Sequence, residues 1–183
     1  MRLFIGIRLA PGAADGLAGT REQFASVSNQ LRWSASDGWH VTLQFLGRTD
    51  EQQQICVVEN LKAISASPLP VRISGLDFFD RAGVFFAGVA LTPELLTLQQ
   101  RVTAATRLCG FIPEARAYHP HITLAHSRGR AGGHVLVPLR RAVERAGVVL
   151  DTEFTADEFL LYESFPGKEG SRYEVRARFP IND

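Results

Sequence analysis

The chain has 183 residues, of which 45% are hydrophobic and 21% charged, and this fits one globular unit or two lobes sharing a core. A formal net charge of only +1 argues against a strongly basic nucleic-acid-binding domain. No apolar stretch approaches the roughly 18–20 residues needed to cross a bilayer. Because Arg8 also interrupts the first apolar run before it reaches signal-peptide length, we expect a soluble, cytoplasmic protein.

The first half of the chain alternates strand and helix patterns. Alternating apolar residues predict a strand over 3–9, and a helical pattern follows from about 13 to 30. The segment WHVTLQFLG at 39–47 predicts another strand, with Val41, Leu43 and Phe45 on its core face. Asp50 is placed to cap a helix that runs to about residue 65.

The second half predicts more strands than helices. Residues 68–80 and 83–91 form a hairpin pattern, and Pro93 opens a helix that stops near Gly110. HPHITLAH at 119–126 predicts a strand, 138–147 a short helix, and 152–163 and 172–179 two final strands. The order predicts an α+β fold, a single domain over 1–183 made of two pseudo-symmetric lobes.

The two cysteines give a separate expectation about the cellular compartment. Cys56 and Cys109 lie in apolar, helix-like contexts and belong to no C-x-x-C pair or ligand-spaced cluster. Buried thiols behave as small hydrophobes, and disulfides are rare in a reducing cytoplasm. We therefore expect two buried free thiols.

The basic residues are compatible with a phosphate ligand. Eighteen of the twenty are arginine, and only Lys62 and Lys168 are lysine. The planar guanidinium matches phosphate oxygens, although a genome-wide preference for arginine codons explains the excess equally well. The arginines therefore permit a phosphate ligand without requiring one.

The four-residue pattern H-x-T-L occurs twice, at 40–43 and 121–124, whereas the composition gives about 0.03 occurrences by chance. In each copy the histidine and the threonine two positions later share one face of a strand. Two histidines across a cleft can act as a pair: one takes a proton from the nucleophile, and the other donates a proton to the leaving group. A threonine hydroxyl can hold a non-bridging phosphate oxygen. The repeat therefore predicts phosphodiester chemistry.

At these residues the sequence resembles the 2H phosphoesterase superfamily, and most of all its bacterial RNA 2',3'-cyclic phosphodiesterases, long called 2'-5' RNA ligases. The likeness extends over RLFIGIRL at 2–9, RWSASDGWHVTLQFLG at 32–47, YHPHITLAH at 118–126 and LLYESFPGKEGSRYEV at 160–175. It implies a bilobal fold in which two antiparallel sheets line a central cleft with helices packed outside. It also implies opening of a 2',3'-cyclic phosphate at an RNA 3' end to a 2'-phosphate, with no metal and no cofactor, and allows reversible 2'-5' ligation.

The resemblance also assigns roles to residues. His40 would donate a proton to the departing O3', His121 would be the base that activates water, and Thr42 and Thr123 would hold the phosphate. The substrates would be RNA with 2',3'-cyclic phosphate ends or small cyclic nucleotides. We expect the enzyme to be a monomer with no membrane partner.

This chain departs from the family at one position. Relatives often carry an arginine two residues after the leucine of the second motif, where this chain has His126. A positive contact would then come from protonated His126, or from Arg128 or Arg130 in the next loop. Strict alternation places His126 on the core face, so a bulge is needed for it to reach the phosphate.

Several polar and aromatic residues are weaker candidates. Gln44 shares the predicted face of His40 and Thr42 and is a candidate contact to phosphate or ribose. Four aromatic residues could stack on a terminal base, although core packing is the default for each: Trp33, Trp39, Phe45 and Tyr118.

Two other functions stay open at the level of sequence. A metal-dependent hydrolase could be built on His119, His121 and either His126 or His134. A noncatalytic RNA-end binding module is the third reading, which the near-neutral charge and the doubled histidine make less attractive. Chelation separates the two enzymes, and turnover of a cyclic nucleotide excludes the binding module.

Overall fold

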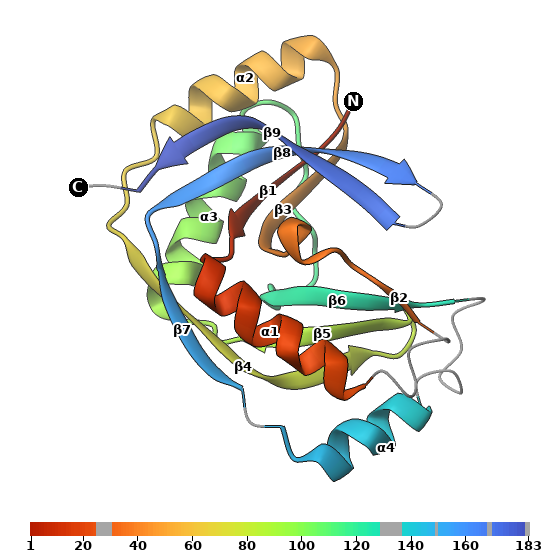
Figure 1. Ribbon diagram of the computed structural model, residues 1–183. Coiled ribbons are helices and arrows are strands. Elements are labelled where there is room, and N and C mark those ends of the chain that lie inside the picture. The colour runs from red at the N-terminus through yellow and green to blue at the C-terminus, as the bar shows by residue number, and fades with distance from the viewer. Residues whose placement is uncertain (25–30, 129–136, 149, 168–169, 182–183) are drawn as a thin grey trace.

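Two antiparallel sheets organise the chain in the computed structural model, which describes residues 1–24, 31–128, 137–148, 150–167 and 170–181 (Figure 1). The first sheet has the order β3 (His40–Arg48), β1 (Arg2–Arg8), β8 (Glu158–Gly167) and β9 (Gly170–Pro180). The second has the order β2 (Leu31–Trp33), β6 (His121–Ser127), β5 (Val84–Val89), β4 (Leu69–Phe79) and β7 (Asp151–Ala156). Each sheet contains one H-x-T-L strand, β3 or β6.

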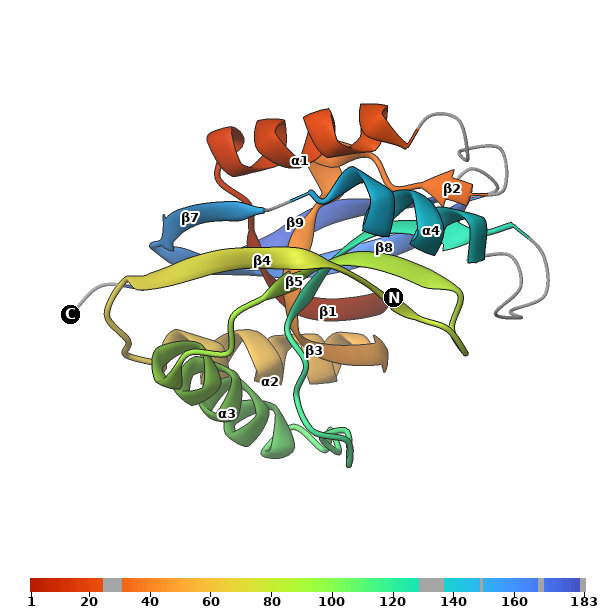
Figure 2. The same ribbon diagram turned by 90° about the horizontal axis from the view of Figure 1, so that it is seen from below.

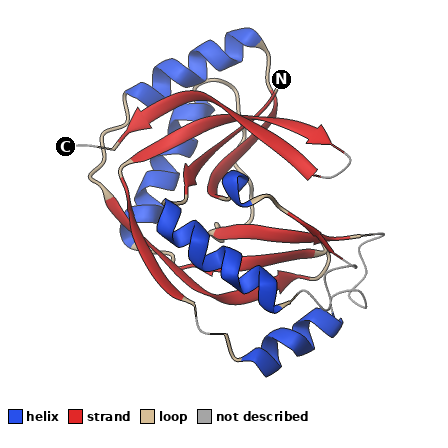
Figure 3. Cartoon of the chain, viewed as in Figure 1, coloured by secondary structure: helices blue, strands red, loops and turns tan. Residues whose placement is uncertain are grey.

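The helices lie outside the sheets, as Figure 3 shows. They are α1 (Pro11–Gln23), the short 3₁₀ turn η2 (Ser36–Gly38), α2 (Glu51–Lys62), α3 (Pro93–Arg107) and α4 (Val137–Ala146). Figure 2 shows α1 on one side of the strands and α2 and α3 on the other, with α4 in front of the strands in this view. The expected α+β architecture of two antiparallel sheets with outer helices is therefore confirmed. No helix among the described residues is long and apolar enough to span a membrane.

Local signals in the sequence explain where the outer helices begin. The Asp50 carboxylate accepts from the Gln53 backbone N–H at 2.8 Å, and the Gln53 side chain accepts from the Asp50 N–H at 3.2 Å, a complete capping box. Thr92 caps α3 in the same way through the backbone N–H of Leu95. Because Pro93 follows this cap at the first helical position, α3 begins where the sequence predicts.

The two faces of β1 are buried in different surroundings. Leu3, Ile5 and Ile7 point into the main core, which also receives the buried faces of α2, α3 and the second sheet. Phe4 points to the other face of the first sheet and packs with Leu160 and Tyr162 in a separate aromatic cluster. This second cluster lies beside His40, so the histidine face of the sheet is buried around Phe4.

The predicted strand over 152–163 is wrong as a single element of one sheet. The chain changes sheets at Asp157: β7 pairs with β4, whereas β8 pairs with β1 and β9. The sequence has no glycine or proline at this point, and the prediction therefore continued one strand through it. The three-residue strand β2 is also absent from the predicted elements, because its length is too short to show a pattern. The predicted end of the first helix, residues 25–30, lies outside the described residues.

The expectation of two free thiols is wrong as well. Cys56 of α2 and Cys109, just beyond α3, form a disulfide with their Cα atoms 5.8 Å apart. The two helices pack against each other, which brings together cysteines that are 53 residues apart in sequence. The sequence indicated helix-like surroundings for both cysteines, but not that the two segments are neighbours.

The close approach of β1 and β3 requires a glycine. A Cβ atom built on Gly6 would lie 2.9 Å from the Val41 carbonyl oxygen and 3.4 Å from Cδ2 of His40. We predict that Gly6→Ala lowers the free energy of unfolding by about 1–3 kcal/mol, the usual cost of overpacking. Gly12→Ala, whose added methyl meets nothing within 4 Å in a helix that favours alanine, should be neutral or stabilising by up to about 1 kcal/mol. Chemical denaturation of both variants tests this, and equal stabilities would contradict it.

Candidate active site

Each H-x-T-L strand contains one extra residue at its leucine. In β3, Gln44 pairs with Ile5 and Thr42 with Gly6, so Leu43 has no partner on β1. In β6, Ala125 pairs with Phe85 and Thr123 with Phe86, which leaves Leu124 unpaired in the same way. Such a bulge places two successive residues on one face and reverses the alternation after it. The two motifs therefore share a backbone irregularity as well as a sequence.

Both histidine rings are held by the same hydrogen bond. His40 Nδ1 lies 2.7 Å from the carbonyl oxygen of Gly38, and His121 Nδ1 lies 2.7 Å from that of His119. Because a carbonyl only accepts, Nδ1 of each ring donates the hydrogen. In the neutral state, Nε2 is then the nitrogen with a free lone pair, so each ring presents the atom that can take or give a proton.

Aromatic rings surround His40 on three sides. Its ring centroid lies 4.5 Å from that of Phe4, 5.1 Å from Tyr173 and 5.8 Å from Tyr162. This burial lowers the pKa of His40 to about 4, against the opposing effect of the Gly38 hydrogen bond, and the charge of His121 lowers it further. His40 is therefore neutral at pH 7 in the protein without ligand.

His121 has a similar environment in the second sheet. Its ring lies 4.9 Å from Phe79 and 5.2 Å from Phe86, both in edge-on contact. Burial lowers the pKa of His121, the hydrogen bond to His119 raises it, and the charge of His119 lowers it. Each ring is thus oriented by a backbone carbonyl and surrounded by phenyl groups, and both are uncharged near neutrality.

Contacts between the sheets bring the two motifs together. Strands β3 and β6 are in contact, and the two histidines are close enough for the charge of His121 to lower the pKa of His40. Tyr118, in the segment that leads into β6, donates its hydroxyl hydrogen to the Thr42 carbonyl oxygen at 2.9 Å. Because burial raises the pKa of Tyr118, its hydroxyl stays protonated and can donate this bond. The approach to the second motif is therefore fixed to the backbone of the first.

The expectation that Gln44 faces the site is wrong. The bulge at Leu43 turns Gln44 into the interior, where it is 7% exposed and its Oε1 accepts from Thr106 of α3 at 2.7 Å. The same reversal brings out Phe45, predicted on the core face but 61% exposed. The Phe45 ring lies 5.8 Å from Phe4, which also contacts His40. Phe45 is therefore on the histidine face.

The reversal applies equally to the second strand. Ala125 is fully buried, and His126 is partly buried on the side opposite to it, the side of His121 and Thr123. Strict alternation gave the wrong face for His126, and the bulge explains why. Burial, and then the charge of Arg32, lower the pKa of His126. In the protein without ligand, these surroundings therefore disfavour the charged form of His126.

The structure describes one of the two other predicted cations. Arg128 is exposed at the end of β6, and its Nε donates to the Leu31 carbonyl oxygen at 2.9 Å, which links it to β2. Arg130 lies outside the described residues, as does His134 of the metal hypothesis. In the parts of the chain that are described, no three His, Cys, Asp or Glu side chains gather where they could hold a metal ion.

Two further arginines border the histidines and were not among the predicted candidates. Arg8 pairs with His40 across β1 and β3 and hydrogen-bonds Tyr162. Arg32 pairs with His126 across β2 and β6, and its charge is felt at Tyr173 in the first sheet. Their positions depend on which strands pair, which no local pattern in the sequence revealed.

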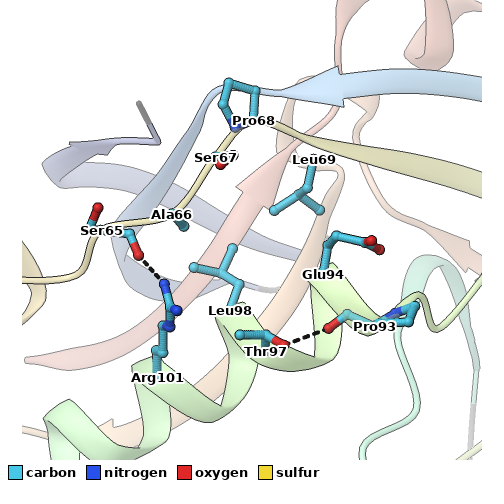
Figure 4. Close-up of a pocket in the computed structure, with 10 residues that line it drawn as sticks. All are labelled: Ser65, Ala66, Ser67, Pro68, Leu69, Pro93, Glu94, Thr97, Leu98 and Arg101. Carbon is cyan, nitrogen blue, oxygen red and sulfur yellow. Dashed lines mark hydrogen bonds between the residues drawn. The ribbon is translucent and has the colours of Figure 1, made fainter. Parts of the chain in front are cut away.

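A separate cavity lies between the start of α3 and the segment that leads into β4 (Figure 4). Its lining includes Ser65, Pro68, Glu94 and Arg101, and Arg101 donates to the Ser65 carbonyl oxygen. None of the histidines or other predicted site residues lines it. It is therefore distinct from the paired motifs.

Comparison with known proteins agrees with this geometry. The model of the 2'-5' RNA ligase superfamily matches residues 22–164. An RNA 2',3'-cyclic phosphodiesterase from Aeropyrum pernix is 30% identical over 169 residues, which cover 88% of this chain and 94% of that protein. One from Bacillus subtilis is 28% identical over 185 residues, covering 98% and 96%. The crystal structure of E. coli LigT complexed with 3'-AMP shares the fold with a TM-score of 0.78 at 20% identity, covering 100% and 98%. The resemblance found in the sequence is confirmed.

The lowered pKa of His40 predicts a pH-dependent stability. Its pKa is about 4 in the folded protein and about 6.5 when unfolded, so the unfolded chain binds the proton more tightly. The free energy of unfolding should therefore be highest above about pH 6.5 and should fall, by up to about 3 kcal/mol, as the pH drops towards 4. Denaturation of His40→Asn over this range should show a flatter curve than the wild type. Parallel curves for the two proteins would contradict the shift.

Proposed function

Since the chain belongs to the 2'-5' RNA ligase superfamily, we propose that it hydrolyses 2',3'-cyclic phosphates at RNA 3' ends to 2'-phosphates, without a metal ion. The observation that carries the proposal is the matched pair of histidines, each held through Nδ1 by the carbonyl two residues earlier. Two bases presented in the same way to one region are suited to a reaction that needs proton removal and proton donation together.

In the proposed reaction, Nε2 of His121 takes a proton from a water molecule as the water oxygen attacks phosphorus. Nε2 of His40 donates a proton to O3' as the bond from phosphorus to O3' breaks. The product carries the phosphate on O2' and a free 3' hydroxyl, and the pair is left with His121 protonated and His40 neutral. One proton transfer through solvent restores the starting state. Thr42 and Thr123, each two residues beyond its histidine, hold the non-bridging oxygens.

The pKa values of the free protein place a condition on this mechanism. His40 must be protonated to act as the donor, although its pKa is about 4 before substrate binds. An anionic phosphate between the two rings raises the pKa of both. The aromatic rings around His40 carry no charge that would stabilise its protonated form. We therefore propose that the substrate phosphate supplies the negative charge, so that His40 becomes protonated when the substrate binds.

The finer parts of the proposal follow from the same site. If a 5' hydroxyl of a second RNA replaces water as the nucleophile and O3' again leaves, the same two histidines support 2'-5' ligation. We propose that the two sheets are the pseudo-symmetric lobes of one domain, each providing one motif. Because one chain carries both motifs, we propose that a monomer is the active species.

Removal of either histidine tests the mechanism. We predict that His40→Ala and His121→Ala each lower kcat for a 2',3'-cyclic nucleotide by about 10²–10⁴-fold. The double variant should lose less than the product of the two single losses, because the groups act as a unit. Steady-state kinetics checks this, with circular dichroism to confirm folding. Near-full activity in either single variant would remove that histidine from the mechanism.

A substrate with sulfur in place of O3' separates the two roles, because a thiolate departs without protonation. We predict that His40→Ala recovers most of its lost rate on this substrate and that His121→Ala does not. The opposite pattern would exchange the donor and the acceptor. Equal losses on both substrates would contradict a dedicated proton donor.

The pH dependence and the response to chelation test the metal-free reading. We predict bell-shaped profiles that belong to the histidine pair as a whole. Because the pKa values of both free histidines are lowered, the maximum of kcat/KM should lie below about pH 6.5, and that of kcat at a higher pH once substrate is bound. Both profiles should survive exhaustive chelation. Activity lost on chelation and restored by a stoichiometric metal would favour the metal-dependent hydrolase, and binding without turnover would favour the RNA-end module.

A further inference from the structure

The two histidine strands match up to their bulges and differ immediately afterwards. Each presents a histidine, a threonine and, beyond the bulge, a third side chain on the same face. On β3 this third residue is Phe45, exposed and apolar, whereas on β6 it is His126, with Arg32 beside it on β2. The site therefore has an aromatic side and a cationic side.

Arg32 is placed on the cationic side by the register of the strands. It pairs directly with His126 across β2 and β6, and paired residues on adjacent strands point to the same face. The Nε of Arg128 fixes this short strand by donating to the carbonyl oxygen of Leu31. The position of the Arg32 side chain thus follows from backbone pairing.

Six arginines of the described chain form ion pairs with carboxylates, and Arg32 is not among them. The ion pairs join Arg72, Arg116, Arg140, Arg172, Arg176 and Arg178 to carboxylates. Within the described residues no carboxylate pairs with Arg32, which is partly buried. A partly buried cation without a counter-charge favours an anionic ligand.

The field of Arg32 extends across the space between the sheets. On β6 it lowers the pKa of His126, adding to burial. On β9 it opposes the effect of burial, which raises the pKa of Tyr173. The Tyr173 ring lies 5.1 Å from that of His40. Arg32 therefore lies close to the proposed reacting phosphate without belonging to either H-x-T-L motif.

We propose that Arg32 forms a second phosphate subsite, which binds the phosphodiester that precedes the terminal nucleotide of the RNA. The inference rests on the proposed function and adds the substrate class: an RNA end is preferred to a cyclic mononucleotide. A terminal nucleotide carries two unlike groups beyond its cyclic phosphate, a base and a 5' phosphodiester. The aromatic side at Phe45 suits the base, and the cationic side at Arg32 suits the phosphodiester.

The position of Arg32 favours the preceding phosphodiester over the reacting phosphate. The two histidines and two threonines already bracket the reacting phosphate symmetrically. Residues on one face of a strand are about 6–7 Å apart, and adjacent strands are about 5 Å apart. Arg32 is one step beyond Thr123 along the face and one strand to the side, so it lies outward from the threonine contact.

The test uses three substrates and three proteins. The substrates are adenosine 2',3'-cyclic phosphate, the dinucleotide ApA with the same cyclic end, and that dinucleotide with an uncharged methylphosphonate linkage. The proteins are wild type, Arg32→Gln and Arg72→Gln. The last removes the same charge from β4 of the same sheet, where Arg72 pairs with Glu153 at 3.0 Å.

We expect wild type and Arg72→Gln to have a kcat/KM about tenfold or more higher for the charged dinucleotide than for the methylphosphonate. Arg32→Gln should lose this difference and keep the mononucleotide rate within about twofold. The salt dependence of dinucleotide kcat/KM should also become shallower by about one phosphate contact.

Two outcomes would overturn the subsite. An equal loss of kcat/KM by Arg32→Gln on all three substrates would place Arg32 at the reacting phosphate, and no loss on any would remove it from substrate binding. If wild type turns over none of the substrates, the proposed function fails. In that case, calorimetry can still compare the affinities of wild type and Arg32→Gln for the 2'-phosphorylated dinucleotide with a charged and with an uncharged linkage. The subsite predicts that only wild type binds the charged form more tightly.

Discussion

The extra residue at the leucine of each motif determines which side chains surround the histidines. An uninterrupted strand would place Gln44 and Ala125 beside the threonines and would bury Phe45 and His126. With the bulges at Leu43 and Leu124, the buried and facing positions are exchanged beyond the motif. The leucine of each motif is therefore the unpaired residue of the bulge as well as part of the core. Because of the bulge, three side chains of each strand lie on the histidine face: the histidine, the threonine, and Phe45 or His126.

The sequence predicted most of the fold, and it failed where the position of a residue depends on pairing between strands that are far apart in the chain. The capping of α2 by Asp50 and the proline at the start of α3 are local signals, and both helices begin as predicted. The repeated motif was enough to predict a catalytic role for His40 and His121, because an imidazole can transfer protons near neutral pH whatever strand it lies on. The bulges, the sheet change at Asp157 and the neighbours Arg8 and Arg32 depend on strand registers that are not encoded in any short window.

Burial of the histidines combines two requirements that usually conflict. Phenyl rings around an imidazole hold it in place but make its charged form unfavourable. The hydrogen bond from Nδ1 to a main-chain carbonyl compensates in part, because it orients the ring and supports the protonated state. An imidazole in these surroundings changes its charge most readily when an anion arrives, so its protonation responds to occupancy of the site.

The change of sheet at Asp157 also has a consequence for how the molecule forms during translation. Both histidine strands are complete once residue 127 has been added, but the first sheet needs β8, which lies between β1 and β9. A nascent chain that has just completed β7 can pair the whole second sheet, whereas in the first sheet β1 can pair only with β3. The second sheet can thus form on the ribosome before the first sheet is complete. A chain truncated near Asp157 would lack Tyr162 and Tyr173, two of the aromatic residues that surround His40.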